Sequence, residues 1–439
     1  MASPPRSAPA RVVVVSHTAD VGGAEIAILR LLRARDRDAF DVSAIVLEEG
    51  AFPDLLRAAG VPTEVIATAA VHRVTRREAA SVGALWRNAV ATLAVARTVR
   101  RKLRGLRAEL VVANSLKGAV ITSIARPLRT PWVWHLHDRL APDYLPVPFV
   151  FAMRALARWS PRLVVANSWA TAQTLRSTPA ERIVVAYPGL PREAFADQGH
   201  PPAATVGIVG RISATKGQRV FLEAARRVLA ENPAARFRIV GGALFEDAAE
   251  ENELRRLVET SPDLRASVEW TGWVADTPAE LRRLSLAVHA SPVPEPFGQV
   301  IMEAMAAGVP VIGTDAGGVP EIIDPSSCAV ELADGVRRSD LGLLVRPGDD
   351  LALARAIGWM LRHDIEAQVM ASAAREAAWE RYGITRTWSV VGDAWATALD
   401  ARRGERGAGS GGADPSAAVA TTTVDPRPDS GEETRDLDD

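Results

Sequence analysis

Short runs of apolar, mostly β-branched residues alternate with helical stretches along this chain, and the alternation starts twice. The first series of runs covers residues 11–16, 42–47, 110–113, 132–135, 163–166 and 183–186. A polar segment with four prolines, at 188–202, follows, and a second series covers 205–209, 236–240, 268–270, 287–290 and 310–313. Strands that alternate with helices form parallel sheets with helices on both faces. The pattern therefore predicts an α/β chain with two Rossmann-like, doubly wound parallel-sheet domains.

The length of 439 residues suits two domains of about 150–200 residues each. We expect a first domain at 1–198, a second at 199–384 and a C-terminal helix at 385–401. Residues 402–439 are rich in Gly, Ala, Ser, Thr, Pro and Asp and lack periodic apolar positions, so they are predicted to be disordered.

The number of cysteines and the lengths of the apolar runs indicate in which cellular compartment the protein is found. Cys328 is the single cysteine, which excludes an internal disulfide framework and fits a reducing environment. The sequence has no apolar run of about 18 residues, and the four valines at 12–15 are too short for a signal-peptide core. We expect a cytoplasmic protein.

Charge is unevenly distributed along the chain. Residues 1–198 carry 27 Lys/Arg against 16 Asp/Glu, whereas 199–439 carry 25 against 37. The densest basic stretch comprises Arg97, Arg100, Arg101, Lys102, Arg104 and Arg107. This stretch is either a solvated helix face or a surface that meets anionic lipid at the inner face of a membrane, or a phosphorylated acceptor. Few aromatic residues lie among these charges, which disfavours nucleic acid.

Two glutamates flank a predicted loop-to-helix junction in the second half. Glu295-Pro296-Phe297-Gly298 precedes a helix expected at 299–307, and Glu303 lies one turn inside it. The first amides of a helix and its dipole favour an anion, so a diphosphate could rest on the amides of Phe297 and Gly298. The Glu303 carboxylate could accept from the two hydroxyls of a ribose. An ordinary helix start with acidic residues explains the spacing equally well.

Further candidates follow predicted strands, where ligands bind in such sheets. Arg211 and Lys216 follow the first strand of the second half and could neutralise a diphosphate, or be ordinary surface charges. Gly22 and Gly23 form a tight loop that could face phosphate, or a simple strand–helix turn.

Two other strand ends carry polar residues. Alternation places His135 and His137 on one side of their strand, followed by Asp138, while Asn167-Ser168 follows the next strand. One of these histidines could orient a ligand through a hydrogen bond, or both could be partly buried residues with a structural role. No convincing third ligand accompanies the histidines, so no metal site is predicted, and the absence of GxSxG disfavours a serine hydrolase.

In these motifs and their order, the chain resembles family 4 of the glycosyltransferases, which have the GT-B fold of two Rossmann-like domains facing a cleft. The series is Gly22-Gly23-Ala24-Glu25, His137-Asp138, Ser168, Tyr187-Pro188-Gly189, Gly210-Arg211, Lys216-Gly217, Glu295-Pro296-Phe297-Gly298 with Glu303, and Gly317-Gly318-Val319-Pro320-Glu321. The resemblance extends over roughly 12–399.

The resemblance implies a retaining hexosyl transfer without a divalent metal or other cofactor. The second domain would hold a nucleotide-sugar, UDP- or GDP-linked, and the first would bind a lipid-linked or saccharide acceptor of polysaccharide biosynthesis. The helix at 385–401 would cross back to the first domain. By the same resemblance, Arg211 and Lys216 neutralise the departing diphosphate, Glu303 holds the ribose, and Glu295 and His137 lie at the transferred sugar. Gly22, Gly23, Phe297, Gly298, Asp138 and Ser168 complete the predicted substrate site.

Three alternatives stay open. A GT-B sugar-nucleotide epimerase would handle the diphosphate in the same way and release a free sugar isomer. A non-catalytic nucleotide- or sugar-binding protein of the same fold would need only the binding residues. A small-molecule acceptor is compatible with the same motifs.

Overall fold

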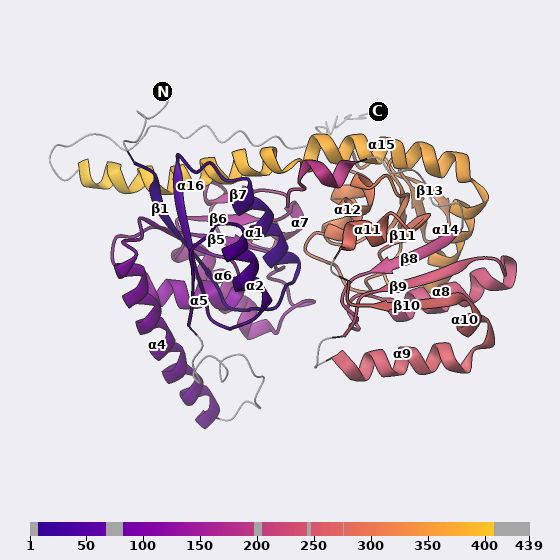
Figure 1. Cartoon of the computed structure of the whole chain (residues 1–439), viewed down its shortest axis with the longest axis horizontal. Coiled ribbons are helices and arrows are strands. Elements are labelled where there is room, and N and C mark those ends of the chain that lie inside the picture. The colour runs from indigo at the N-terminus through magenta and orange to yellow at the C-terminus, as the bar shows by residue number, and fades with distance from the viewer. Residues whose placement is uncertain (1–7, 67–81, 197–203, 244–246, 275, 408–439) are drawn as a thin grey trace, which may run out of the picture. The chain divides into compact units, whose positions relative to one another are not determined.

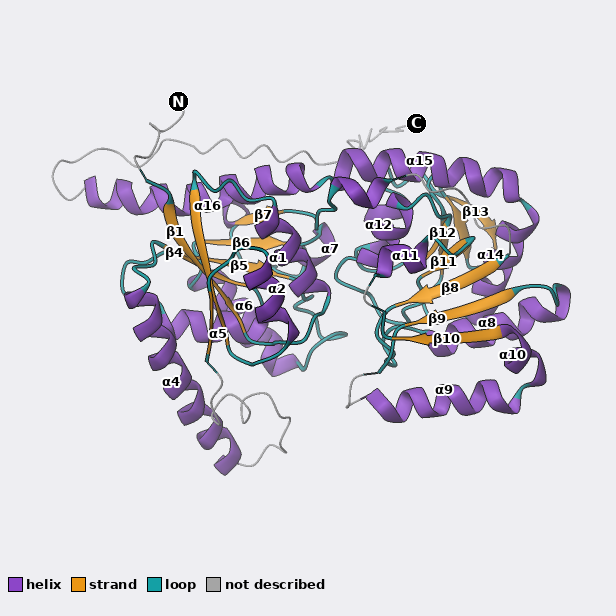
Figure 2. Ribbon diagram, viewed as in Figure 1, coloured by secondary structure: helices purple, strands orange, loops and turns teal. Residues whose placement is uncertain are grey.

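The computed structural model describes residues 8–66, 82–196, 204–243, 247–274 and 276–407. They divide into two compact units, each built on one sheet (Figures 1 and 2). The first unit comprises the described residues within Met1–Asp197, Val293–Ala307 and Glu376–Pro415, and the second those within Gln198–Pro292 and Gly308–Arg375. The predicted α/β class with two Rossmann-like sheets is confirmed.

Parallel strands build the sheet of the first unit. Within the described residues they are β1 (Ala10–Ser16), β2 (Phe40–Val46), β3 (Thr63–Val65), β4 (Leu110–Ala113), β5 (Trp132–Leu136), β6 (Leu163–Ala166) and β7 (Ile183–Val185). The strand order is β3-β2-β1-β4-β5-β6-β7, so the direction of winding reverses between β1 and β4. Ligands bind beyond the carboxyl ends of the strands at such a reversal.

Helices cover both faces of this sheet, which explains the unbroken valine run in β1. Val12 and Val14 pack into a core with α1, α2 and α16, whereas Val13 and Val15 pack into a second core with α4 and α5. The helices of this unit are α1 (Gly23–Arg33), α2 (Ala51–Ala58), α4 (Val82–Gly105), α5 (Leu116–Ala125), α6 (Val147–Trp159), α7 (Trp169–Ala172), α12 (Gln299–Ala306) and α16 (Ile384–Gly407), with 3₁₀ turns η1 (Ala180–Arg182) and η2 (Arg192–Phe195).

The last helix, α16, is part of the core of the first unit. It packs against α1 and strands β4, β5 and β6, and the buried Trp395 belongs to the same core as Val12 and Val14. The helix extends to Gly407, so the first residues of the predicted tail are helical. The rest of that predicted tail lies outside the described residues.

The second unit has a mixed sheet. Its strands are β8 (Thr205–Val209), β9 (Arg236–Val240), β10 (Val268–Gly272), β11 (Leu286–Val288), β12 (Val311–Thr314), β13 (Val330–Ala333), β14 (Val336–Arg338) and β15 (Leu343–Val345), in the order β10-β9-β8-β11-β12-β15-β14-β13. The winding reverses between β8 and β11. Strand β14 runs antiparallel to both β13 and β15, so a hairpin extends the parallel part.

Most helices of the second unit pack against its sheet in one large core. They are α8 (Gln218–Glu231), α9 (Ala248–Thr260), α10 (Pro262–Ser267), α11 (Thr277–Leu281), α13 (Val319–Ile323) and α14 (Asp350–Arg362), and α15 (Asp364–Tyr382) begins in this unit and ends in the first. Among the described residues, no helix combines the length and hydropathy needed to cross a bilayer.

Candidate functional site

Polar residues gather at the carboxyl edge of the first sheet. His17 follows β1, Asn114 and Ser115 follow β4, His137 follows β5, and Ser168 follows β6. Because all of these strands are parallel, their carboxyl ends meet at one edge of the sheet. The loop with Gly22 and Gly23 begins at the same edge, beside the reversal between β1 and β4.

A chain of hydrogen bonds fixes the protonation of His137. The Asn114 amide nitrogen Nδ2 donates to the Ala24 carbonyl at 3.4 Å, which turns Asn114 Oδ1 toward His137 Nε2 at 3.0 Å. Since an amide oxygen can only accept, Nε2 must carry the proton, and Nδ1 keeps its lone pair. Within the described residues Nδ1 is buried and has no hydrogen-bond partner. His137 can therefore accept a hydrogen bond from a ligand hydroxyl at Nδ1.

His135 is held from the opposite direction by the last helix. The Trp395 indole N–H donates to His135 Nε2 at 3.1 Å, so this nitrogen is unprotonated. His135 and His137 both line a cavity of about 30 Å³ together with Asn167 and Tyr187. A cavity of this size accommodates a hydroxyl group or a water molecule.

His17 is a site residue that the sequence did not single out. Ser115 Oγ accepts the backbone N–H of Gly118 at the start of α5, and it lies 2.8 Å from His17 Nδ1. A hydroxyl oxygen has two lone pairs, so Ser115 can either donate to His17 Nδ1 or accept from it, according to the tautomer of the ring. No motif at residue 17 marks this role, because the pair forms only when β1 and β4 are neighbours.

The histidines at this edge are neutral at physiological pH. Burial lowers the pKa of His137 to about 4 and that of His135 to about 3, where the neighbouring His137 adds to the effect. Burial, followed by the charge of Lys117, lowers the pKa of His17 to about 4. These rings serve as neutral hydrogen-bonding groups and contribute no cation at pH 7.

Two carboxyl groups at the same edge are perturbed in the opposite direction. Burial raises the pKa of Glu25 to about 7, and the negative charges of Asp138 and Asp20 add to the rise. Hydrogen bonds from the backbone N–H groups of Glu25 and Gly22 act in the opposite direction and lower this pKa. The Gly22 N–H lies 3.2 Å from Glu25 Oε2. Burial also raises the pKa of Asp138 to about 6, although the Tyr144 hydroxyl donates to it. Glu25 can therefore take up a proton near neutral pH.

The segment with the two predicted glutamates belongs to the first unit and lies against that loop. Gln299 Nε2 donates to the Gly23 carbonyl at 3.0 Å, and a Cβ at Gly23 would come within 2.8 Å of that nitrogen. Helix α12 starts at Gln299, and its N-cap Gly298 has φ +101°, which favours glycine. The predicted helix start is confirmed.

Side chains of the first unit also hold the backbone just before α12. Ser168 Oγ donates to the Pro296 carbonyl at 2.5 Å while accepting the Thr171 N–H, and Phe297 is buried and stacked on Tyr187 with ring centroids 5.5 Å apart. Glu295 is buried in the same stretch. These contacts position the backbone amides that the sequence assigned to phosphate.

Glu303 forms a contact that the sequence did not predict. Its Oε1 lies 2.8 Å from Nη2 of Arg30, on α1. Both side chains are largely buried, with 16% and 13% of their surface exposed for Arg30 and Glu303. Within the described residues Arg30 Nη1 is buried without a hydrogen-bond partner. One guanidinium nitrogen of Arg30 can therefore still donate a hydrogen bond.

Arg211 and Lys216 lie in the second unit, in the loop between β8 and α8. Arg211 follows Gly210, which has φ +150°, and its Nη1 lies 3.7 Å from Asp247 Oδ2. The loop is fixed by Gln218, which donates to the Arg211 carbonyl, and by Ser291, which donates to the Thr215 carbonyl. Both cations thus follow the first strand of the second sheet at the edge where its winding reverses.

Gly217 explains why the loop can lie so close to the end of β11. It has φ +81°, and a Cβ there would be 1.9 Å from the Ala290 carbonyl oxygen.

Among the described residues, no group of three His, Cys, Asp or Glu side chains could hold a metal ion.

Two family models match the chain. The model described as Glycosyltransferase Family 4 matches residues 21–194, and the model described as Glycosyl transferases group 1 matches residues 203–363. Between them they include every site residue that the sequence predicts.

Curated relatives match over shorter stretches. A D-inositol 3-phosphate glycosyltransferase of Segniliparus rotundus is 34% identical over 137 residues, 30% of each chain. One of Mycobacterium marinum is 30% identical over 234 residues, 50% of this chain and 45% of that protein. The chain thus matches less than half the length of these two relatives.

Solved structures match over nearly the whole chain. The Anabaena protein HepE in complex with UDP-glucose has 26% sequence identity and a TM-score of 0.72, covering 88% of this chain and 99% of that protein. The sucrose-phosphate synthase of Thermosynechococcus elongatus, with 18% identity and a TM-score of 0.70, shares the fold. Together with the two family models and the two parallel-sheet units, these matches show that the chain belongs to glycosyltransferase family 4 and has the GT-B fold.

Proposed function

We propose that this protein is a retaining, metal-independent glycosyltransferase that uses a nucleotide-sugar donor. The observation that carries the proposal is the contact between two predicted donor motifs, the loop at Gly22–Gly23 and the segment from Glu295 to Glu303, through the bond from Gln299 to Gly23. The similarity to HepE, whose structures hold UDP and UDP-glucose, favours a UDP-linked sugar as the donor.

The proposed roles follow from the chemistry of each group. Glu303 accepts hydrogen bonds from the ribose hydroxyls, and Arg30 keeps its carboxylate in place. The amides at Phe297 and Gly298 bind the diphosphate, and Arg211 and Lys216 neutralise its charge. Glu295 accepts from hydroxyls of the donor sugar, and His137 accepts from another at Nδ1.

In the proposed reaction, an acceptor hydroxyl attacks C1 of the donor sugar and the bond from C1 to the diphosphate oxygen breaks. The leaving diphosphate takes the bonding electron pair, and one of its oxygens takes the acceptor proton on the same face of the sugar. Negative charge grows on the leaving oxygen, so the cations and amides stabilise the transition state more than the ground state. The neutral His137, with its low pKa, serves as a hydrogen-bonding group and adds no charge.

For the acceptor, we propose a lipid-linked or saccharide precursor met at an anionic membrane surface. One face of α4 supports this proposal, because the exposed Val90 and Leu93 are followed along the helix by exposed Arg97, Arg101 and Arg104. This spacing of three or four residues places them on a common stripe. Apolar residues beside arginines suit the boundary between headgroups and acyl chains.

Nucleotide binding tests the donor proposal most directly. UDP, GDP, ADP and their sugars should be titrated into the full chain, with and without EDTA. We expect one nucleotide class to raise the melting temperature, equally with EDTA, and Glu303→Ala to abolish the effect. No response to any nucleotide would contradict the proposal.

The stereochemistry and the metal independence need a turnover assay. With the nucleotide-sugar that the titration identifies as the donor, proton NMR of the first product formed should show the anomeric configuration of the donor, and EDTA should leave the rate unchanged. Loss of activity in EDTA that magnesium restores, or an inverted anomer, would overturn those parts of the proposal. Release of a free sugar isomer without transfer would identify an epimerase.

A membrane assay tests the stripe on α4 separately. Vesicles of phosphatidylcholine with phosphatidylglycerol should bind the protein, and high salt should release it. The double variant Arg97→Gln, Arg101→Gln should bind less. Equally strong binding to vesicles of phosphatidylcholine alone would show that the arginines of α4 do not attract the protein to anionic lipid.

A further inference from the structure

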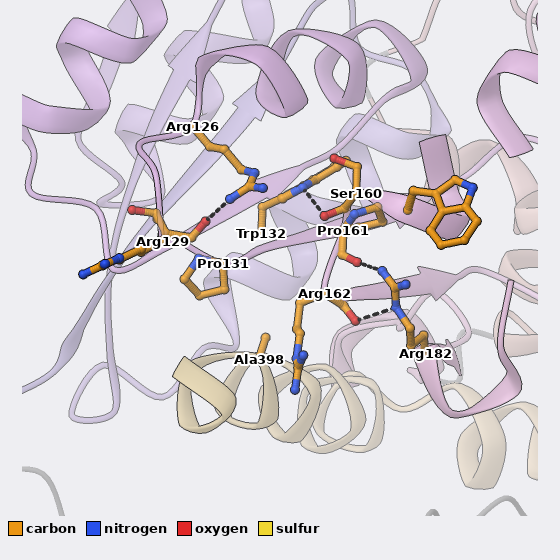
Figure 3. A pocket seen from close by; sticks show the side chains of 11 residues that line it. Arg126, Arg129, Pro131, Trp132, Ser160, Pro161, Arg162, Arg182 and Ala398 are labelled. Carbon is orange, nitrogen blue, oxygen red and sulfur yellow. Dashed lines mark hydrogen bonds between the residues drawn. The ribbon is translucent and has the colours of Figure 1, made fainter. Parts of the chain in front are cut away.

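An open cavity lies in the first unit at the edge of the sheet opposite the candidate donor site. It has a volume of about 370 Å³ and is lined by residues that precede β5, β6 and β7 and by Ala398 of α16 (Figure 3). His137 and Ser168 of the candidate donor site lie after the carboxyl ends of β5 and β6, whereas the residues that line this cavity lie before the amino ends of β5, β6 and β7. Strand β5 alone separates the two edges by about 13 Å, at about 3.3 Å per residue. One small ligand cannot occupy both places.

The lining of this cavity is strongly basic. Arg126, Arg129, Arg162 and Arg182 contribute to it, and the described lining residues include no aspartate or glutamate. Guanidinium groups bind phosphate through paired N–H donors, with a geometry that suits two of its oxygens at once. The lining therefore favours an anion.

Arg182 forms a fixed wall of the cavity. Its guanidinium donates to the carbonyls of Arg158, Pro161 and Arg162, and Figure 3 shows it against the backbone of the last two. Burial, followed by the nearby charge of Arg162, lowers the pKa of Arg182 against the opposing effect of Glu181, and Arg158 adds to the lowering. The guanidinium thus adds positive potential at a place that the backbone determines.

Arg126 offers a donor that the fold leaves unused. Its Nη1 donates to the Thr130 carbonyl at 3.1 Å, which holds the side chain across the turn. Its Nε, however, is buried, and no hydrogen-bond partner for it exists among the described residues. A buried N–H without a partner costs roughly 1–3 kcal/mol, so an acceptor brought by a ligand would be favoured there.

The rim of the cavity carries two further unusual features. Arg129 has φ +69°, a left-handed conformation that is costly for a residue with a side chain. Trp159 is 75% exposed, and the Arg158 guanidinium lies over its ring, 4.6 Å from the ring centroid. A large exposed indole beside arginines provides a flat apolar surface on which a sugar ring can pack.

We propose that this cavity is a second binding site, for a phosphomonoester carried on a small polar group such as a sugar. Arg126 and Arg129 bind the phosphate, and Trp159 packs against the ring that carries it. The phosphate can come from a soluble sugar phosphate or from a lipid headgroup, which share the same chemistry. This site is independent of the proposed donor site, so either proposal can fail without the other.

Calorimetric titration of glucose 6-phosphate into the full chain tests the site, with glucose as the uncharged comparison. We expect glucose 6-phosphate to bind and glucose not to, and Arg126→Met and Arg129→Met each to weaken binding by about tenfold or more. Arg129 is exposed, so its variant should fold even if that of Arg126 does not. Arg33→Met, which removes an exposed arginine on α1, should bind glucose 6-phosphate as the unaltered protein does.

A second arm distinguishes the two sources. Vesicles of phosphatidylcholine with phosphatidic acid, which carries a phosphomonoester, are compared with phosphatidylcholine alone. Binding in either arm that falls in both arginine variants supports the site and identifies the source. Absence of binding in both arms, equal binding by the variants, or displacement of glucose 6-phosphate by saturating UDP would overturn it.

Discussion

Arg30 Nη2 lies 2.8 Å from Glu303 Oε1, and 273 residues separate the two in the chain. Both side chains are largely buried, so the charges are poorly screened. A double-mutant cycle with Arg30→Met and Glu303→Gln should give a coupling energy of about 1–3 kcal/mol in the free energy of unfolding. The exposed pair Arg57–Asp54 is the matched control, with an expected coupling below about 0.5 kcal/mol.

The same variant bears on the proposed ribose role. If Arg30 holds the Glu303 carboxylate in place, Arg30→Met should weaken UDP binding about tenfold, and Arg33→Met should not. Titration calorimetry measures both. Unchanged affinity in Arg30→Met, together with complete loss in Glu303→Ala, would limit Arg30 to a structural role.

His137 should be neutral and protonated at Nε2 at pH 7, because Asn114 Oδ1 accepts from that nitrogen and its pKa is about 4. Imidazole nitrogen chemical shifts measured by NMR report the tautomer. Asn114→Leu removes the acceptor and should populate the Nδ1-protonated form. Ser115→Ala should change the shifts of His17 and leave those of His137 unaltered. A wild-type His137 protonated at Nδ1 would contradict the hydrogen-bond chain.

Glu25 should make the protein less stable as the pH rises. Its folded pKa of about 7 exceeds the ordinary glutamate pKa of 4.5, so ionisation costs more in the folded state than in the unfolded state. The stabilising effect of the protonated group is complete below about pH 4.5 and is lost as the pH rises to about 7. Glu25→Gln should therefore stabilise the protein at pH 8, by about 1–3 kcal/mol, and have little effect at pH 5.

Urea unfolding at the two pH values measures this difference. Glu49→Gln, which changes an exposed glutamate of the same unit, should show no comparable pH dependence. An equal effect of Glu25→Gln at both pH values would show that packing, and not ionisation, controls its contribution.

Gly217 should tolerate no side chain, because a Cβ would overlap the Ala290 carbonyl oxygen at 1.9 Å. Gly217→Ala should lower the free energy of unfolding by more than about 2 kcal/mol and displace the loop that carries Lys216. Gly272→Ala separates the two causes, since Gly272 has φ +67° but open space around its Cβ position. It should cost only about 1 kcal/mol. Thermal unfolding measures both variants. If Gly217→Ala and Gly272→Ala lose the same stability, the overlap with the Ala290 carbonyl is not the cause of the loss in Gly217→Ala.

The strands were predictable because most of them are buried in parallel sheets. The apolar runs at 110–113, 163–166, 205–209 and 236–240 match β4, β6, β8 and β9. The hairpin of β13 and β14 escaped prediction, because β13 is largely exposed and contains Glu331. A short exposed hairpin has no apolar run to mark it.

For the candidate site, local motifs identified the loops but not the pairs. Gly22, His137, Ser168 and Gly298 all lie beside strand ends or helix starts, where the sequence placed them. The partners Arg30, Asn114 and Ser115 are separated in sequence from the residues that they hold. Neither periodicity nor spacing reports such contacts, since they depend on which strands and helices become neighbours.

The place of α16 in the first unit has a consequence for synthesis. Val391, Trp395 and Leu399 fill the same core as Val12 and Val14, so this core needs both early and late parts of the chain. A nascent chain that has emerged only to residue 197 holds all the described strands of that sheet but lacks α16, which shares one face with α1 and α2. The apolar surface that α16 covers stays exposed until the second unit has been translated, and during this interval the chain is open to chaperone binding and to aggregation.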